Sequence, residues 1–270
     1  MVPYIETALK EGFGVIITNG NDNVDSNNRP IQGSESAQDH FVYVWNNFIK
    51  KAKAEHIVIV AHSFGGVVVL HGLRNIKEAK ERIKAVAFTD SVHSVGHYES
   101  SDIKQFFKER TRNWVSSREP LDTPIRSYYE GDTCELVSAG TTESVWTSHC
   151  AKDSVFRFFK EKLDKEEKGK AVQEVFLPGN LKLLKIAIPV DAGKKDPQGF
   201  FFMSEYALSF KKLIILMHGG GAVRAGQWSR SVIINENHES GTMVPYIEKA
   251  LEEGFGVIIT NGAAVRGTRD

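Results

Sequence analysis

The chain has few features that would place it in a membrane, in an oxidising compartment or on nucleic acid. Only two of its 270 residues are cysteines, and the spacing of Cys134 and Cys150 matches neither a metal site nor a disulfide framework. No apolar run reaches the length of a membrane span, and MVPYIETALKEG at the start is too polar for a secretory signal. The 34 basic residues balance 34 acidic ones, so no net charge attracts nucleic acid or anionic membranes. We therefore expect a soluble intracellular protein.

An unbroken apolar run ends at a serine in IVIVAHSFGG, at 57–66. Ser63 is flanked two positions away on each side by a small residue, Ala61 and Gly65. This pattern is typical of a nucleophile elbow, in which a buried strand turns sharply into a helix and presents the serine hydroxyl above the sheet. Small residues are needed because a larger Cβ substituent would clash at such a turn. The alternatives are an ordinary strand-to-helix crossover and a weak phosphate-binding turn, although the Walker pattern is missing.

A second glycine-rich motif, LIILMHGGG at 213–221, supports the first. A buried strand that runs into His-Gly-Gly-Gly is the arrangement by which lipase-type hydrolases direct backbone N–H groups at an oxyanion. The N–H groups of Phe64, Gly219 and Gly220 would form this oxyanion hole. A generic glycine turn is the alternative. A pyrophosphate loop would need GxGxxG spacing and a downstream acid.

A serine nucleophile needs a base, and the base needs an acid that orients it. His149 is the preferred base because it follows a predicted strand by a loop and precedes a helix that Asp153 could cap. Asp122 is the preferred acid, and Asp90 is the alternative. Asp122 follows the strand NWVSS, which is the usual location, and Asp90 ends the strand KAVAFTD.

Further polar residues are predicted to surround the pocket. His62 lies inside the elbow, and His218 opens the glycine loop. Arg224 and Trp228 could stand at the entrance, where an arginine would favour a carboxylate or phosphate group, although packing of Arg224 on Trp228 is equally consistent with the sequence.

The stretch DSVHSVGH at 90–97 could be interpreted as a metal site. It lacks the helical presentation of HExxH and a suitable acid partner, so we predict that His93 lines the pocket and that no metal is bound. No motif calls for a cofactor.

The chain also contains a long internal repeat. MVPYIETALKEGFGVIITNG at 1–20 returns at 243–262, with differences only at Thr7 (Lys249) and Lys10 (Glu252). Each copy predicts a short helix followed by the strand FGVIIT, so the two copies would compete for one position in one sheet. We expect the carboxy-terminal copy to dock, because it continues directly from a preceding long helix. The other copy could then support swapped oligomers.

Strands and helices alternate between the copies, which predicts one α/β domain over 1–270 with a mainly parallel sheet and helices on both faces. The segment 164–173 is predicted to be a charged linker that joins the natural ends of the domain, and 263–270 to be a frayed tail. Strands are predicted at 13–18, 56–62, 83–89, 113–117, 134–139, 181–190, 199–206 and 212–218. Helices are predicted at 36–54, 65–80, 101–111, 153–166 and 227–252.

Several segments match one known family: AHSFGG at 61–66, FTDSVHSVGH at 88–97, NWVSSREPLDT at 113–123 and HGGGAVRAGQWSR at 218–230. Within them, VRAGQW and SSREPLDT are quite specific. Through these segments nearly the whole chain resembles the Arb-two domain family, an Argonaute-binding family that includes animal cotranscriptional regulators and the tail domain of some fungal histone deacetylases. The order of segments differs from that family, because those from about 174 onward are normally amino-terminal and here follow the Ser, Asp and His segments.

The resemblance implies an α/β-hydrolase-like fold, circularly permuted, in which hydrolase activity is suspected. It also implies association with Argonaute, chromatin and splicing proteins, in nucleus and cytoplasm. Two hypotheses follow. The chain is a protein-binding regulator that keeps a hydrolase-like pocket, or it is an active serine hydrolase that acts on a small-molecule or acylated ester, thioester or amide.

Overall fold

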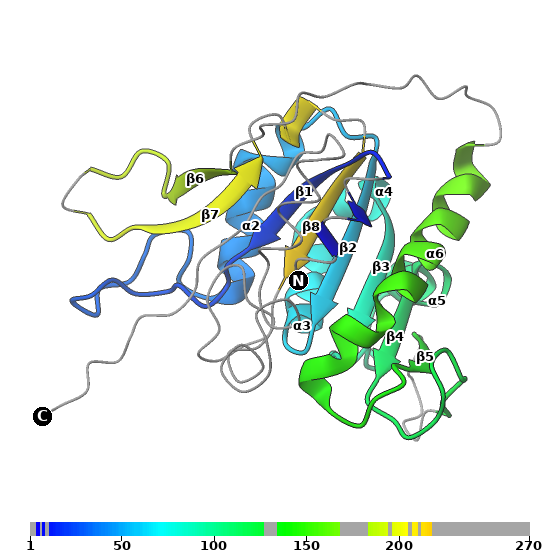
Figure 1. Cartoon of the computed structure of the whole chain (residues 1–270). Helices are drawn as coiled ribbons and strands as arrows, with labels where there is room; N and C mark the ends of the chain where they lie inside the picture. Colours follow the sequence, from blue (N-terminus) through cyan, green and yellow to red (C-terminus); the bar gives the residue numbers. More distant parts are fainter. Residues whose placement is uncertain are drawn as a thin grey trace, which may run out of the picture.

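The computed structural model describes residues 4–5, 7–8, 11–126, 134–167, 183–193, 196–204, 207–209 and 212–217. These residues form one eight-stranded sheet in the order β5-β4-β3-β2-β8-β1-β7-β6 (Figure 1). All eight predicted strands are confirmed, and the observed ends differ from the predicted ends by no more than two residues. They are β1 (Phe13–Thr18), β2 (His56–His62), β3 (Ile83–Thr89), β4 (Thr111–Val115), β5 (Glu135–Ser138), β6 (Leu183–Ile188), β7 (Gly199–Ser204) and β8 (Lys212–Met217).

The sheet is mainly parallel, as the alternation of strands and helices predicts. Each neighbouring pair from β5 through β4, β3, β2 and β8 to β1 is parallel. Only β7 reverses direction, and it pairs antiparallel with both β1 and β6. The carboxyl ends of the other seven strands therefore lie at one edge of the sheet, which is where ligands bind in open α/β sheets.

Helices cover both faces of the sheet, which confirms the predicted α/β class. One apolar core packs α2 (Ala37–Asn47), α3 (Gly65–Asn75) and α5 (Ser101–Arg110) on one face, and a second packs α6 (Thr147–Glu167) on the other. Side chains of β2 alternate between these cores, which explains why the sequence of a strand buried on both sides is an unbroken apolar run. The remaining short elements are η1 (Ile49–Lys51), α4 (Ala79–Arg82), η2 (Ser144–Trp146) and η3 (Ala207–Ser209). None of the described helices is long and apolar enough to cross a membrane.

The amino-terminal copy of the repeat occupies the sheet. β1 lies between β8 and β7, pairs residue by residue with β8 and is buried along its whole length. The expectation that the carboxy-terminal copy fills this position is therefore wrong for the described structure. Both copies carry the same strand FGVIIT, so the strand sequence itself does not discriminate between them. The second copy, at 243–262, lies outside the described residues.

The longest helix, α6, extends beyond its predicted limits at both ends. It begins at Thr147 instead of 153, because the 3-10 turn η2 leads directly into it and the Thr147 hydroxyl donates a hydrogen bond to the carbonyl of Ser144. Its backbone continues to Glu167, so the first four residues of the predicted linker, 164–167, are helical. The remaining predicted linker at 168–173, the helix at 227–252 and the tail at 263–270 lie outside the described residues.

Asp22, in the loop after β1, is a carboxylate that is partly buried against β7. Burial raises the pKa of Asp22 to about 6, although Lys185 and a hydrogen bond donated by the backbone N–H of Phe200 act in the opposite direction. Because the folded-state pKa lies above that of the unfolded chain, the stability that this group contributes is present in full below about pH 4. It is lost as the pH rises through 6.

We expect Asp22→Asn to raise Tm at pH 7.5 by about 2–6 °C, because the amide accepts the Phe200 hydrogen bond without carrying a buried charge. The gain should vanish near pH 4.5, where Asp22 is already protonated. Thermal unfolding of both proteins across this pH range checks the result. Asp25→Asn in the same loop is the control and should give no gain, because hydrogen bonds donated by Arg29 and Asn27 lower the pKa of Asp25. A lower Tm for Asp22→Asn at pH 7.5 would contradict the prediction.

Candidate active site

Ser63 occupies the turn between β2 and α3 in a strained backbone conformation. Its φ is +50°, in the left-handed region that costs about 1–3 kcal/mol for a residue other than glycine. The Ser63 N–H donates to the carbonyl of Thr89 at 3.1 Å, and the Ser63 carbonyl accepts from Gly66 and Val92, each at 3.3 Å. A serine at a strained strand-to-helix turn has the backbone geometry that the elbow motif predicts.

Backbone strain is concentrated at the residues that the sequence singles out. Four of the described non-glycine residues have positive φ, and three of them are predicted site residues: Ser63, Asp90 and Asp122. Strained residues persist only where the surrounding structure holds them, and they cluster at functional sites. The distribution of strain therefore supports one functional region that draws on several loops.

Gly66 permits the close approach of α3 to the loop after β3. A Cβ added at Gly66 would lie 1.9 Å from Ser91 Oγ and 3.0 Å from His93 Nδ1. His93 itself is nearly buried, because its ring packs on Phe88 and Phe107 and its Nδ1 shares a hydrogen bond with Ser91 Oγ at 2.8 Å. His93 thus lies beside the elbow, as part of the packing between α3 and β3.

Gly66→Ala should lower the stability of the fold by about 1–3 kcal/mol, because Ser91 and His93 must move to admit the methyl group. Thermal or denaturant unfolding measures the loss. Gly96→Ala is the matched control, since nothing lies within 4 Å of a Cβ added there. Equal stabilities of the two variants would show that the α3 contact is looser than the structure indicates.

A buried hydrogen-bonded network joins three chain segments at the carboxyl edge. His62 Nδ1 lies 2.8 Å from the carbonyl oxygen of Thr89, so this nitrogen carries the hydrogen, and Thr89 Oγ1 lies 2.8 Å from Ser148 Oγ. All three residues are buried, and burial lowers the pKa of His62. In the sequence, each is followed directly by a predicted catalytic residue: Ser63, Asp90 and His149. The network therefore fixes the relative positions of the three backbone segments that carry these residues.

His149 lies in the first turn of α6 rather than in the predicted loop, so Asp153 follows it one helical turn later and does not cap the helix. The imidazole packs edge-on against Trp146, with ring centroids 5.6 Å apart. Partial burial lowers the pKa of His149, which keeps the ring neutral and able to accept a proton at pH 7. Within the described part of the chain, no hydrogen bond joins the side chains of Ser63, His149 and either candidate acid.

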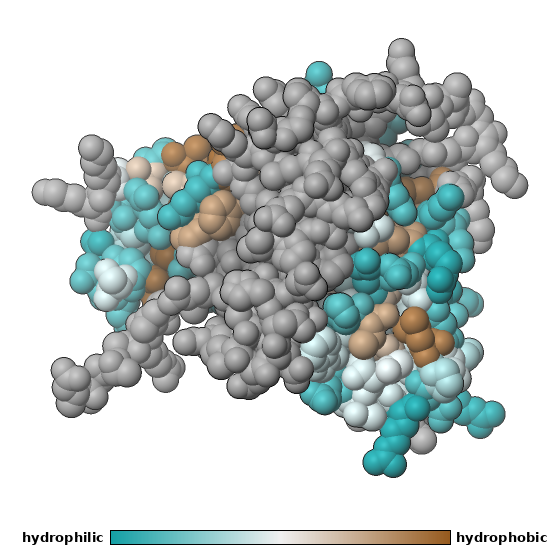
Figure 2. All heavy atoms as spheres, in the orientation of Figure 1, coloured by the Kyte–Doolittle hydropathy of each residue, from teal (hydrophilic) through white to brown (hydrophobic). Residues whose placement is uncertain are grey.

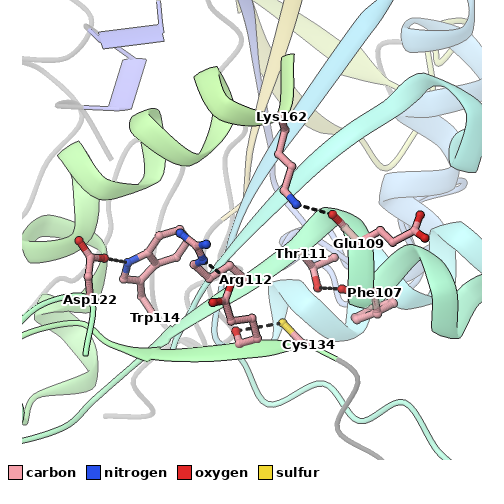
Figure 3. A network of polar contacts seen from close by, with 9 residues as sticks. Phe107, Glu109, Thr111, Arg112, Trp114, Asp122, Cys134 and Lys162 are labelled. Carbon is pink, nitrogen blue, oxygen red and sulfur yellow. Dashed lines mark hydrogen bonds and ion pairs between the residues drawn. The ribbon is translucent and has the colours of Figure 1, made fainter. Parts of the chain in front are cut away.

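Asp122 uses both carboxylate oxygens to hold the loop after β4 against α6. Oδ1 accepts from Trp114 Nε1 at 2.8 Å, as Figure 3 shows. Oδ2 accepts from Ser154 Oγ at 2.6 Å and from Arg157 at 2.9 Å. These contacts give Asp122 a structural role. The sequence does not reveal this role, because Ser154 and Arg157 lie more than thirty residues away.

Asp90 stands at the end of β3, next to the elbow strand. Its Oδ1 accepts from both the N–H and the hydroxyl of Ser116, at 3.0 and 3.1 Å. Its charge opposes the lowering of the His62 pKa, which places the carboxylate near the elbow. Among the described residues, no hydrogen bond reaches Asp90 Oδ2, so this oxygen can still accept one from a neighbouring imidazole.

Of the three residues predicted to form the oxyanion hole, the described structure includes Phe64. Phe64, which directly follows the serine, has a backbone N–H without an acceptor among the described residues. β8 pairs with β2 so that Met217 lies opposite Ala61, and β8 therefore ends at the edge that carries Ser63. Five predicted site residues lie outside the described residues: His218, Gly219, Gly220, Arg224 and Trp228.

Several exposed apolar side chains lie in segments that follow the strands of this edge. The described residues expose six large hydrophobic side chains, and five of them lie in segments that follow the carboxyl ends of β2 to β5: Phe64, Val92, Tyr98, Leu121 and Val145. Figure 2 shows hydrophobic atoms among hydrophilic ones over the β4–β5 end of the sheet. Among the described residues, no group of three His, Cys, Asp or Glu side chains could hold a metal ion.

The comparison with known families agrees with the sequence resemblance. The Arb2 domain matches residues 1–121 and 150–269, which is most of the chain. The chain belongs to the Arb2 domain family. This Arb2 chain is similar to proteins named cotranscriptional regulator ARB2A or its homolog: 33% identical over 216 residues in Xenopus tropicalis, 32% over 213 in Homo sapiens and 34% over 200 in Dictyostelium discoideum.

The similarity covers part of each protein. The three alignments span 59–61% of the Arb2 chain and 51–52% of the relatives, so the chain spans about half the length of the curated relatives that it matches. No solved structure matches the Arb2 chain significantly.

Proposed function

We propose that this chain is an Arb2-type regulator of gene expression and that its Arb2 domain carries a serine hydrolase site. The observation that carries the site is Ser63 at φ +50° between a buried strand and a helix, with a hydrogen-bonded network that fixes the segments of Ser63, Asp90 and His149 together. The chain order Ser, Asp, His is the order found in α/β-hydrolases. Mainly parallel strands with helices on both faces are consistent with that fold.

In the proposed mechanism, Ser63 Oγ attacks the acyl carbon of the substrate while His149 takes the hydroxyl proton. Asp90 orients the imidazole and stabilises its charged form. The negative oxygen of the tetrahedral intermediate accepts hydrogen bonds from the N–H of Phe64 and from Gly219 and Gly220. His149 then gives its proton to the leaving group, and water hydrolyses the acyl-enzyme by the same steps.

We assign the orienting acid to Asp90 rather than Asp122. Both oxygens of Asp122 are engaged by Trp114, Ser154 and Arg157, whereas Oδ2 of Asp90 remains available within the described residues. This preference reverses the order that the position after β4 suggests from sequence alone.

The segment order supports a circularly permuted hydrolase. In α/β-hydrolases the His-Gly-Gly-Gly loop follows the third strand of the hydrolase fold and comes before the elbow in sequence. Here the motif comes after the elbow in sequence, yet β8, which leads into it, lies directly beside β2 in the sheet. A circular permutation, which moves the chain ends to another loop of the same fold, accounts for both facts.

The substrate class that this edge favours is an ester, thioester or amide with an apolar acyl group. Phe64 follows the serine and is 37% exposed, and Val92, whose N–H donates to the Ser63 carbonyl, is 63% exposed. Exposed apolar side chains next to a reactive group favour an apolar ligand. Labelling of the wild-type chain by a fluorophosphonate probe tests the hydrolase site, and complete absence of labelling in folded protein would overturn it.

The regulatory role rests on the names of the relatives, which are cotranscriptional regulators. We propose that this chain likewise acts in the nucleus, and also in the cytoplasm, through Argonaute, chromatin and splicing proteins rather than by direct contact with nucleic acid. Zero formal net charge supports recruitment by proteins. A crosslinked pull-down from native cells should recover at least one such partner, and a pull-down that recovers none would contradict this role.

A further inference from the structure

The β1 position of the sheet is a docking site for which the chain contains two matching segments. β1 is held on one side by six parallel register pairs with β8 and on the other by antiparallel pairs with β7. In the helical residues before it, Tyr4, Ile5 and Ala8 are fully buried, and the ring of Tyr4 packs 5.7 Å from that of Phe156 on α6. The docked unit is therefore a helical turn and a strand together.

Every buried residue of this unit recurs in the second copy. Tyr4, Ile5 and Ala8 return as Tyr246, Ile247 and Ala250, and FGVIIT returns unchanged at 255–260. The two differences fall at Thr7, which is only partly buried, and at Lys10, a charged position. The packing that holds β1 therefore cannot discriminate between the copies.

Chain connectivity also allows the second copy to reach the site. The segment 218–254 separates the end of β8 from the second FGVIIT and exceeds the dozen or so residues that a parallel crossover needs. Docking of the second copy would place consecutive strands side by side through a crossover, which is a common arrangement in α/β folds.

We infer that the slot between β8 and β7 accepts either copy of the repeat and that the two copies of one chain exchange in it. The occupant that competes with β1 is the segment 243–262 of the same chain. This inference does not depend on the hydrolase activity. Docking of one copy releases the other, so the chain always carries one surplus apolar helix-strand unit.

Substitution of one buried isoleucine in each copy tests this inference. We expect Ile16→Asp and Ile258→Asp each to lower Tm by less than about 5 °C, because the intact copy takes the slot. The double variant should lose more than about 10 °C or fail to fold, because both occupants then bury a charge. Ile59→Asp on β2 is the matched control: Ile59 and Ile16 are both 0% exposed and pack in the same core, but β2 has no duplicate.

Each other outcome overturns the inference. If Ile16→Asp is as damaging as Ile59→Asp while Ile258→Asp is silent, only the first copy docks. The reverse pattern would show that only the second copy docks. If Ile16→Asp folds only at high protein concentration, as followed by light scattering and Tm over a dilution series, the replacement strand comes from another chain rather than from the same one.

Discussion

Ser63→Ala is expected to abolish labelling by a fluorophosphonate probe and to lower kcat/KM for an activated ester by about 10⁴-fold or more, because the attacking oxygen is removed. The fold should be unaffected, since alanine at φ +50° carries the same backbone strain as serine. Labelling in gel and ester hydrolysis measure the first effect, and thermal unfolding measures the second.

Ser63→Gly provides a control that separates catalysis from folding. Glycine adopts positive φ without strain, so this variant should be as inactive as Ser63→Ala but more stable, by about 1 kcal/mol or more. An inactive variant with a raised Tm excludes misfolding as the cause of lost activity. Labelling that persists in either variant would place the reactive group elsewhere in the chain.

Substitutions of the two candidate acids should separate catalytic from structural roles. Asp90→Asn is expected to lower kcat by about 10²- to 10⁴-fold with little change in stability, because the imidazole loses the partner that stabilises its charged form. Asp122→Asn should instead lower stability by about 1–3 kcal/mol while kcat stays near the wild-type value, because the contacts with Trp114, Ser154 and Arg157 weaken. Steady-state kinetics and denaturant unfolding of both variants provide the comparison.

Ser154→Ala is the matched control for Asp122, because it removes one donor to the same carboxylate without touching the charge. It should reproduce part of the stability loss and none of the kinetic effect. The opposite pattern, with kcat lost in Asp122→Asn and retained in Asp90→Asn, would assign the orienting role to Asp122.

The central strands could be predicted from sequence because strands buried on both faces leave a simple pattern. In the sequence, β2 and β8 are apolar runs. The small residues around Ser63 predict the turn that follows β2. The start of α6 could not be predicted in the same way. TTESVWTSHC has no helical apolar period, and a cap at Asp153 was locally plausible, whereas the actual start depends on the 3-10 turn that precedes it.

The polar contacts of the site could not be predicted from the sequence for a different reason. Thr89 and Ser148 are single hydroxyl residues beside predicted catalytic ones, and nothing local indicates that they meet each other and His62 in the interior. The engagement of Asp122 by α6 likewise depends on how that helix packs across β4. Such contacts are determined by the packing of distant elements, so only the folded structure reveals them.

The duplicated helix-strand unit has a consequence for how the gene can evolve. Where either of two repeat copies can fill one position in the sheet, a damaging substitution in one copy is masked by the other. Selection against that substitution is then weaker. Redundancy of this kind normally erodes, with one version drifting while the other is maintained. Two copies that still agree at every position buried in the first copy therefore point either to a young duplication or to separate tasks that keep both under purifying selection. Orthologues from related species would distinguish the two histories.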